Sequence, residues 1–246
     1  MIVDGKRLEY CLYKDSRRHY GESGQLFIAK DGKGRFCLVK TKPADVTNEF
    51  VAHKVAKLMG VPASNAVLID NRGNIEVGIT YENDFQRTSV EELRLLSDEE
   101  RHLSDFMAYM ALKDLLLIDD NHQFAFSHGK LYSFDYAISF CVDERTFGAM
   151  CILNDYHIPS TNFRNNFRLG NYYYKAIDLL ERKSDESKKF LQDAYIDTLL
   201  RFCHTDPAKF QPIWNDLNAA FKPVIADFYR TCIEERMKVL NAMLVT

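Results

Sequence analysis

Two acidic positions on either side of a short hairpin are the residues of this sequence best placed to do chemistry. Asp119 and Asp120, with His122 close behind, follow an apolar segment that has the pattern of a helix, and Asp135 ends an apolar run farther along. In phosphoryl transfer, one carboxylate orients the attacking hydroxyl and another holds Mg²⁺. The spacing therefore predicts a phosphoryl-transfer site, in which Asp120 faces the hydroxyl and Asp135 holds the metal.

A β-hairpin would bring these acids together. Residues 124–126 and 131–134 are apolar runs of strand length, and residues 127–129, Ser-His-Gly, are suited to the turn between them. Asp135 then lies where the second strand ends. A carboxylate at that place, between two aromatic residues, is costly to bury unpaired, so a metal ion or a basic side chain is expected beside it.

The same residues also have simpler structural interpretations. Asp119 and Asp120 could cap the turn after the helix, which is a common use of aspartate. His122 is expected to hold that turn by hydrogen bonding rather than to act as an acid or a base. Turn chemistry gives no reason for the isolated acid at position 135, which favours catalysis.

The first 80 residues have the pattern of short strands around one helix. The helix is expected to follow Thr41, with Asp45 or Thr47 as its cap and Gly60 as its end. Turn-forming residues separate the strand-like runs. These runs are residues 8–13, 25–29, 36–40, 66–69 and 75–81.

From Thr88 onward the apolar period changes to that of helices. Ser89 and Ser97 each begin an S-x-x-E capping box. Residues 141–170 sustain no period, which predicts a long loop containing little more than a short helix, and residues 171–246 read as successive helices.

The order of these segments predicts an α+β protein of two lobes. A strand-rich lobe with one helix would span residues 1–80, and a helical lobe with the acidic hairpin would span residues 81–246. A short connector near residues 80–84 would join them, with the functional cleft between the lobes.

The composition allows such an enzyme and excludes some partners. The chain has 246 residues, 46% of them apolar, which is ample for a core. The net charge of -3 comes from 32 basic and 35 acidic side chains mixed along the chain. Neither nucleic acid nor a membrane surface is therefore expected to bind directly.

Cysteine usage and hydropathy favour a cytoplasmic location. The 6 cysteines lie far apart and form no C-x-x-C pair, which argues against a zinc site or a disulfide framework and favours reduced thiols. The chain begins with a charged segment, and no stretch reaches the roughly 18 apolar residues of a membrane span. A soluble, cytoplasmic protein is expected.

The order of parts resembles the protein-kinase-like superfamily, and within it the HipA-like bacterial kinases and the phosphatidylinositol kinases. Residues 36–40, Phe-Cys-Leu-Val-Lys, resemble the strand whose lysine grips the nucleotide phosphates. Residues 48–50, Asn-Glu-Phe, resemble the motif that places a helix glutamate opposite that lysine. The resemblance implies that Lys40 neutralises the phosphates and that Glu49 orients Lys40.

The acidic turn extends this resemblance, which covers about residues 20–140. In these families the catalytic turn reads D-x-H-x-x-N, and residues 120–122, Asp-Asn-His, match its first three positions. Asp135 matches the metal-binding acid. The asparagine expected as second metal ligand is replaced by Ala125, unless a shortened turn lets Gln123 or Asn121 reach the same place. Gln123 is therefore the candidate second ligand.

The resemblance also implies an ATP site. Residues 21–25 resemble the small-residue loop whose backbone amides cover the phosphates, and residues 78–83 would form the hinge that offers backbone groups to adenine. The cofactors implied are ATP and Mg²⁺. The residues expected to contact the nucleotide, besides Lys40, are Ser23, Gly24, Gln25, Ile79, Tyr81 and Glu82.

The expected function is an ATP- and Mg²⁺-dependent phosphotransferase of the HipA-like type. The resemblance implies a serine/threonine protein substrate, which could be the chain itself at Ser23, and an antitoxin-like partner. Three alternatives stay open. The chain could be a pseudokinase, altered at Ala125, that binds a nucleotide and regulates a partner. It could be a helical interaction protein with an unrelated strand-rich half. It could also be a lipid or small-molecule kinase, although it has no basic membrane-facing run.

Overall fold

The computed structural model describes residues 2–12, 27–30, 34–81, 84–95, 101–119, 123–181 and 184–244. The strands are β1 (Ile2–Asp4), β2 (Glu9–Leu12), β3 (Phe27–Lys30), β4 (Phe36–Lys40), β5 (Ala66–Asn71), β6 (Asn74–Tyr81), β7 (Gln86–Thr88), β8 (Gln123–Ser127) and β9 (Lys130–Phe134). The α-helices are α1 (Pro43–Leu58), α2 (Val90–Arg94), α3 (Arg101–Leu116), α4 (Glu144–Leu153), α5 (His157–Asn165), α6 (Asn171–Leu180), α7 (Asp185–Cys203), α8 (Gln211–Ala220) and α9 (Pro223–Leu244).

The strands of the N-terminal part form one sheet in the order β1-β5-β6-β4-β3-β2. β1 runs parallel to β5, and the other neighbours are antiparallel. The strand predicted at residues 36–40 is present as β4, between β6 and β3, so Lys40 ends an interior strand. A Cβ added to Gly78 of β6 would lie 2.7 Å from the terminal methyl of Ile69, so a larger residue here would force the Ile69 side chain to move.

The predicted acidic hairpin is confirmed. β8 and β9 pair so that Ser127 lies opposite Lys130. His128 and Gly129 between them have φ angles of 49° and 69°. Two consecutive positive φ angles give the turn whose twist matches a tight hairpin. β7, which the sequence pattern did not indicate, adds a third strand beside β8.

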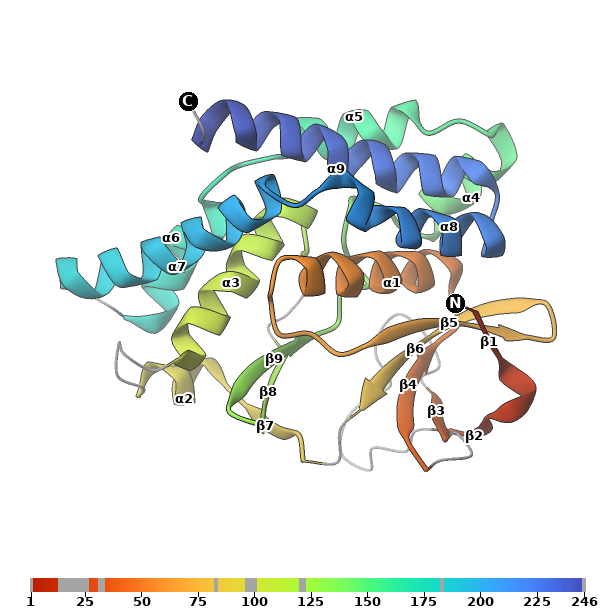
Figure 1. Ribbon diagram of the computed structural model, residues 1–246, viewed down its shortest axis with the longest axis horizontal. Helices are drawn as coiled ribbons and strands as arrows, with labels where there is room; N and C mark the ends of the chain where they lie inside the picture. Colours follow the sequence, from red (N-terminus) through yellow and green to blue (C-terminus); the bar gives the residue numbers. More distant parts are fainter. Residues whose placement is uncertain are drawn as a thin grey trace.

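Helix α1 lies between the six-stranded sheet and helices α8 and α9 (Figure 1). Every residue from 46 to 53 is buried, as expected for a helix covered on all sides. This stretch includes the polar residues Asn48, Glu49 and His53. Polar groups in such a place need partners inside the protein. The buried polar side chains of α1 must therefore bind to other parts of the chain.

The predicted cap of α1, Asp45 or Thr47, is wrong. The helix begins at Pro43, a residue suited to the first helical position because it has no N–H to satisfy. The N–H of Ala44 instead donates to Glu144 Oε1 of α4 at 2.7 Å. A carboxylate from a distant helix thus caps α1, which no local pattern could indicate.

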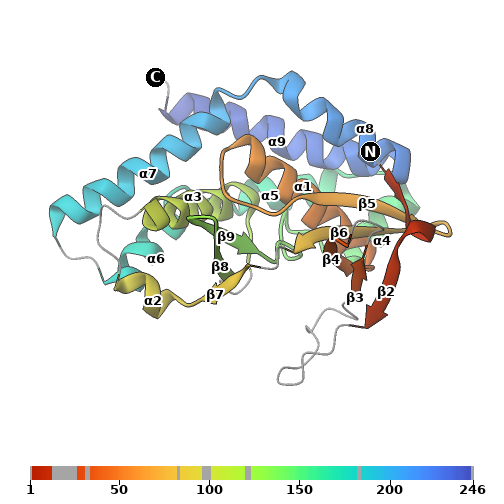
Figure 2. The same ribbon diagram turned by 60° about the horizontal axis from the view of Figure 1, so that its bottom comes forward.

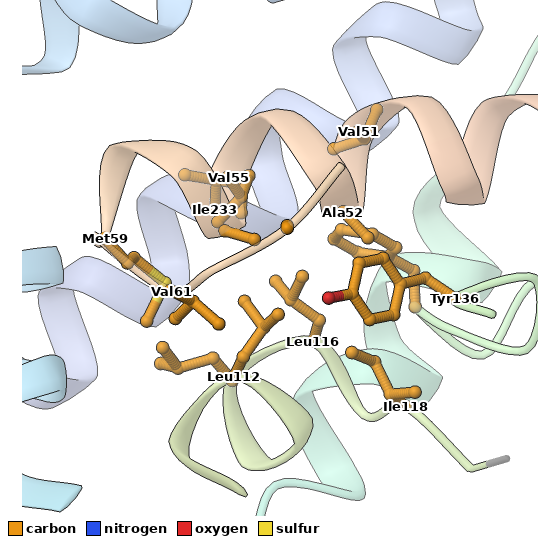
Figure 3. Close-up of a cluster of buried hydrophobic side chains, with 14 of the residues drawn as sticks. Val51, Ala52, Val55, Met59, Val61, Leu112, Leu116, Ile118, Tyr136 and Ile233 are labelled. Atoms are coloured by element: carbon orange, nitrogen blue, oxygen red, sulfur yellow. The ribbon is translucent and has the colours of Figure 1, made fainter. Parts of the chain in front are cut away.

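One hydrophobic core joins the two parts of the molecule. It contains residues of α1, β5 and β6 together with residues of α3, α7, α8 and α9. Figure 3 shows Met59 of α1 and the following Val61 close to Leu112 of α3, and Ala52 of α1 close to Tyr136. Because α1 packs on the sheet and on the helices at once, it connects the two parts of the molecule.

Residues 141–170, predicted to be a long loop with little more than a short helix, contain the two helices α4 and α5. Asp143 caps α4 by accepting a 2.7 Å hydrogen bond from the N–H of Thr146. α4 buries only two side chains, Phe147 and Met150, among its residues. So few buried positions leave almost no apolar period, which is why the pattern was missed.

The remaining helices agree with the sequence pattern. Ser89 and Glu92 form the predicted capping box at the start of α2, whereas the second box, at Ser97 and Glu100, lies outside the described residues. Helices α6 to α9 fall where helices were predicted, and Figure 2 shows α9 running above α1 with the sheet below it.

Two further findings concern the environment of the chain. Within the described ranges, no helix combines the length and the apolar character needed to cross a bilayer. Five cysteines of the described ranges form no disulfide with one another. They are Cys37, Cys141, Cys151, Cys203 and Cys232.

Candidate active site

Lys40 and Glu49 form a buried ion pair. Lys40 Nζ lies 2.5 Å from Glu49 Oε1, with the lysine side chain 15% exposed and the glutamate fully buried. The pair joins the end of β4 to the middle of α1. A buried carboxylate needs such a partner, because an uncompensated charge in the interior is strongly destabilising. The two residues that were expected to act together are therefore in direct contact.

Asp135 is the third member of this cluster. Its Oδ1 accepts a hydrogen bond from Lys40 Nζ, and its Oδ2 lies 3.1 Å from Gln123 Nε2. The residue directly follows β9 and has a φ of 66°, a left-handed conformation that aspartate tolerates better than most residues. Its side chain is 29% exposed, so it faces both the buried lysine and solvent.

Glu49 also holds the backbone that follows Asp135. Its Oε1 accepts a 3.0 Å hydrogen bond from the N–H of Tyr136. Its Oε2 lies 3.2 Å from Nε2 of the buried His53, close enough for an ion pair with a protonated ring but without the alignment of a hydrogen bond. The His53 ring packs against the ring of Tyr136 with 4.5 Å between centroids. One carboxylate thus fixes both the lysine and the segment after β9.

Backbone hydrogen bonds join the end of α3 to the loop after β9. The N–H of Asp119 donates to the carbonyl of Ile138 at 3.0 Å, and the N–H of Phe140 donates to that of Leu116 at 2.7 Å. Leu117 and Phe140 at this junction have φ angles of 51° and 56°. Such conformations are strained for these residues and persist where the surroundings enforce them. The acidic turn therefore starts beside the loop that carries the third member of the cluster.

Asp120, the residue expected to orient the hydroxyl, lies outside the described residues. The same holds for Asn121 and His122. Asp119, which precedes them, is described and exposed.

Opposite charges outweigh burial in the cluster. Burial by itself favours the neutral forms of Lys40 and Glu49. Against it, Glu49 and Asp135 raise the pKa of Lys40 above its ordinary value. Lys40 and His53 likewise lower the pKa of Glu49 to about 2. Both groups are therefore charged throughout the neutral pH range.

The oxygen donors near Lys40 fit Mg²⁺. At nucleotide sites this ion takes one or two carboxylates and completes its shell with phosphate oxygens and water. Asp135 supplies a partly exposed carboxylate, and Gln123 could present its Oε1 after rotation of the amide. Ala125, at the position of the expected asparagine, is buried in β8. Gln123, whose amide contacts Asp135, stays the candidate for the second metal ligand.

This donor set is too small to bind a metal ion alone. In the part of the chain that the structure describes, no group of three or more histidine, cysteine or carboxylate side chains could hold a metal. Mg²⁺ would therefore depend on the phosphates of a nucleotide or on the acids of the turn that begins at Asp119. That dependence is usual for Mg²⁺, which is seldom bound by protein side chains alone.

The residues expected to contact the nucleotide are described only in part. Ile79 is 4% exposed within β6, whose backbone is paired with β4 and β5. Tyr81 ends β6, is 37% exposed and packs edge-on against Phe85. Residues 78–81 of the predicted hinge therefore belong to β6, and the role of the segment in binding adenine stays a prediction. The candidates that lie outside the described residues are Ser23, Gly24, Gln25 and Glu82.

A second buried carboxylate, which the sequence pattern did not indicate, lies in α3 and is linked through Tyr172 to the backbone just before Asp119. Asp114 of α3 is 2% exposed and accepts hydrogen bonds from the Tyr195 hydroxyl at 2.5 Å and from the N–H of Tyr172 at 3.1 Å. The Tyr172 hydroxyl donates to the carbonyl of Ile118 at 3.0 Å. Burial, only partly offset by these donors, raises the pKa of Asp114 to about 6.

Replacing Asp114 by asparagine should remove a pH dependence of stability. Because its pKa in the folded protein lies above the ordinary 3.8, the folded state binds the proton more tightly than the unfolded chain. This stabilisation is complete below about pH 4 and is lost as the pH rises through about 6, by on the order of 3 kcal/mol. Urea unfolding of both proteins across this range measures it, and equal slopes would contradict the expectation.

Comparison with known proteins extends the geometric findings. No family model matches the sequence, and no curated protein sequence matches it significantly. The crystal structure of the proinflammatory kinase CtkA from Helicobacter pylori is similar, with a TM-score of 0.65 and 14% identity over 100% of this chain and 98% of that chain. The chain has a protein-kinase-like fold. The predicted α+β architecture, strand-rich first and helical afterwards, is thereby confirmed.

A weaker likeness is found to a HipA protein. The structure of HipA from Shewanella oneidensis MR-1, solved with HipB and operator DNA, has a TM-score of 0.48 and 12% identity over 98% of this chain and 66% of that chain. A score at this level adds no independent support. Both parts of the chain match one kinase structure, so the strand-rich part and the helical part belong to one fold.

Proposed function

We propose that the chain is an ATP- and Mg²⁺-dependent phosphotransferase, and more specifically a serine/threonine protein kinase of the HipA-like type. The observation that carries the proposal is the convergence of Lys40, Glu49 and Asp135 in a chain with a kinase-like fold. Phosphoryl transfer needs a basic side chain that binds the phosphates and a carboxylate that holds this side chain in place. It also needs a second carboxylate that binds Mg²⁺. The three residues are of these types.

The chain's residues would divide the work as follows. Lys40 would bind phosphate oxygens of ATP, and Glu49 would keep the ammonium group charged and directed at them. Asp135, with Gln123, would hold Mg²⁺, which supplies positive charge where the transferred phosphoryl group develops negative charge. Asp120 would accept or position the hydroxyl of the acceptor.

The direct contact of Lys40 with Asp135 suits this division. The two side chains neutralise each other in the structure. When Mg·ATP binds, Lys40 would exchange the carboxylate for a phosphate and Asp135 would exchange the ammonium for the metal. Each charge would thus keep an opposite charge beside it, and neither would pass through an unpaired state, which is what makes buried ions costly.

The remaining assignments belong to the same proposal. Ser23, Gly24 and Gln25 would cover the phosphates with backbone amides, and Tyr81 and Glu82 would border the adenine. Ile79 would contribute a side chain, since its backbone is used by the sheet. The acceptor would be a protein serine or threonine, with Ser23 of this chain included, the partner would be antitoxin-like, and the location would be the cytoplasm.

Transfer of label from γ-labelled ATP tests the proposal. With Mg²⁺, the protein or added serine- and threonine-containing peptides should become labelled, and omission of Mg²⁺ should prevent it. Asp120→Asn should abolish labelling because the hydroxyl loses its orienting carboxylate. Asp185→Asn, on a fully exposed side chain of α7, should leave it unchanged. Absence of label with every acceptor, the chain itself included, would defeat the proposal.

A pseudokinase is the second candidate, and Ala125 is the observation that favours it. This residue cannot replace the oxygen of the expected asparagine, so a site that relies on it would lack one metal ligand. A rise in the melting temperature with Mg·ATP, together with no label transfer, would identify this function. Label transfer that requires Gln123, lost in Gln123→Ala, would exclude it.

A further inference from the structure

Asn48, the residue before Glu49 on α1, is a fully buried amide that holds the loop after Asp135. Its Nδ2 donates to the carbonyl of Ala137 at 2.6 Å and to that of Val142 at 2.9 Å. Both partners can only accept, so the orientation of the amide is fixed, with its nitrogen facing them. Asn48 thus ties α1 to two points of the loop that begins at Asp135.

The C-terminal helix holds the remaining group of this amide. The Tyr229 hydroxyl of α9 donates to Asn48 Oδ1 at 2.7 Å and lies 2.8 Å from Thr47 Oγ1. Tyr229 is fully buried, and its ring packs edge-on against Phe140 with 4.9 Å between centroids. Both N–H groups and the oxygen of Asn48 therefore have partners, and a fully satisfied buried network of this kind specifies one arrangement of its elements.

Glu49 and Asn48 hold the same loop from consecutive positions. Glu49 accepts a hydrogen bond from the N–H of Tyr136 while it contacts Lys40. Figure 3 shows the Tyr136 ring among apolar side chains of α1 and α3. A shift of α1 large enough to separate Glu49 from Lys40 would also break the contacts of Asn48. Because a buried polar group that loses its partner is expensive, the network opposes that shift.

We propose that Asn48 and Tyr229 are positioning residues of the candidate kinase. They lock α1, the loop after Asp135 and α9 into one unit, which keeps Glu49 against Lys40 without a separate activating event. The catalytic consequence rests on the proposed function. The structural content, a Lys40–Glu49 pair that depends on the Tyr229 hydroxyl, can be tested in the absence of ATP.

The test measures how fast acetic anhydride acylates Lys40 in the full chain. Only a neutral amine attacks this reagent and displaces acetate, so pairing with Glu49 and Asp135 protects Lys40. Mass spectrometry gives the rate relative to Lys189, whose side chain is 74% exposed. Tyr229→Phe removes one oxygen and keeps the ring, and it should raise the relative rate about tenfold, as expected when one buried hydrogen bond is lost. Glu49→Gln should raise it at least as much.

Two matched variants separate this effect from a general loss of structure. Thr47→Val removes the other neighbour of the Tyr229 hydroxyl and leaves its bond to Asn48, so it should raise the rate less. Tyr173→Phe removes a hydroxyl that donates to the carbonyl of Lys188 at 3.3 Å, and it should leave the rate unchanged. If Tyr229→Phe does not fold, Asn48→Ser replaces it in the test and should raise the rate by a similar factor.

The outcomes distinguish the inference from the proposed function. An unchanged rate in Tyr229→Phe beside a raised rate in Glu49→Gln would overturn the positioning role alone. Unchanged rates in both variants would overturn the protective pair and with it the inference. If the variants show the expected acylation rates but the wild-type protein transfers no phosphate, the positioning role is supported and the proposed function is defeated. In an active protein, Tyr229→Phe should lower kcat about tenfold and leave KM for ATP nearly unchanged.

Discussion

Lys40→Met should abolish phosphoryl transfer and also lower the free energy of unfolding by about 3–5 kcal/mol. The destabilisation comes from Glu49, which is fully buried and would lose the ammonium group that now lies 2.5 Å away. A buried charge deprived of its partner is costly because nothing offsets its lost hydration. Urea unfolding followed by circular dichroism measures the stability, and transfer of label from γ-labelled ATP measures the activity.

The double variant of Lys40→Met with Glu49→Gln provides the control for this prediction. It should recover most of the lost stability and none of the activity. A neutral amide at position 49 can still accept the hydrogen bond of the Tyr136 N–H and needs no cation. The double-mutant cycle should therefore give a coupling energy above about 2 kcal/mol between the two sites. Additive effects would mean that the pair does not form in solution.

Asp135→Asn should lower kcat by about a thousandfold, which is comparable to the loss of one strong electrostatic contact in a transition state. Asparagine has the same shape, tolerates the φ of 66° and can still accept a hydrogen bond from Lys40. What it lacks is the negative charge that Mg²⁺ requires. Single-turnover label transfer measures the rate.

The fold of this variant should be nearly unaffected, which makes its activity informative. Lys40 keeps Glu49 as its charged partner in this variant, and the new amide can still accept its hydrogen bond, so the loss of stability should be about 1 kcal/mol. The melting temperature should therefore shift by no more than a few degrees. Asp135→Ala is a poorer test because alanine is strained at a positive φ. If Asp135→Asn kept the activity of the wild type, the carboxylate of Asp135 would not be needed for phosphoryl transfer.

The elements that carry the cluster were predictable because each has a local signature. Residues 36–39 are four apolar residues in a row, which indicates a strand, and the structure reproduces it as β4. The hairpin was predicted from two apolar runs around Ser127, His128 and Gly129; its second strand ends at Phe134 as expected, and its first extends one residue farther, to Ser127. The partnership of Lys40 with Glu49 came from the family resemblance, since spacing alone does not pair a strand lysine with a helix acid.

The interactions that hold the cluster in place could not be predicted, because their partners are remote in sequence. Asn48 is separated by 89 residues from Ala137 and by 181 residues from Tyr229. Glu144 caps α1 across 100 residues. Each of these residues is polar and unremarkable in its local context. Only the fold shows that they meet.

Two elements were missed for a different reason. β1, Ile2–Asp4, is too short to have a period and pairs in parallel with β5, so its existence depends on a distant strand. β7, Gln86–Thr88, is polar and is defined by its pairing with β8. Sequence patterns detect elements that are half buried over several residues. Neither strand meets that condition.

Calorimetric titration with ATP, with and without Mg²⁺, tests the central claim most directly, namely that Lys40, Glu49 and Asp135 form a site for Mg·ATP. Wild-type protein should bind ATP more tightly when Mg²⁺ is present, and Asp135→Asn should lose this enhancement while still binding ATP through Lys40. An enhancement that survives in Asp135→Asn, or ATP affinity that Mg²⁺ does not change in the wild type, would contradict the account.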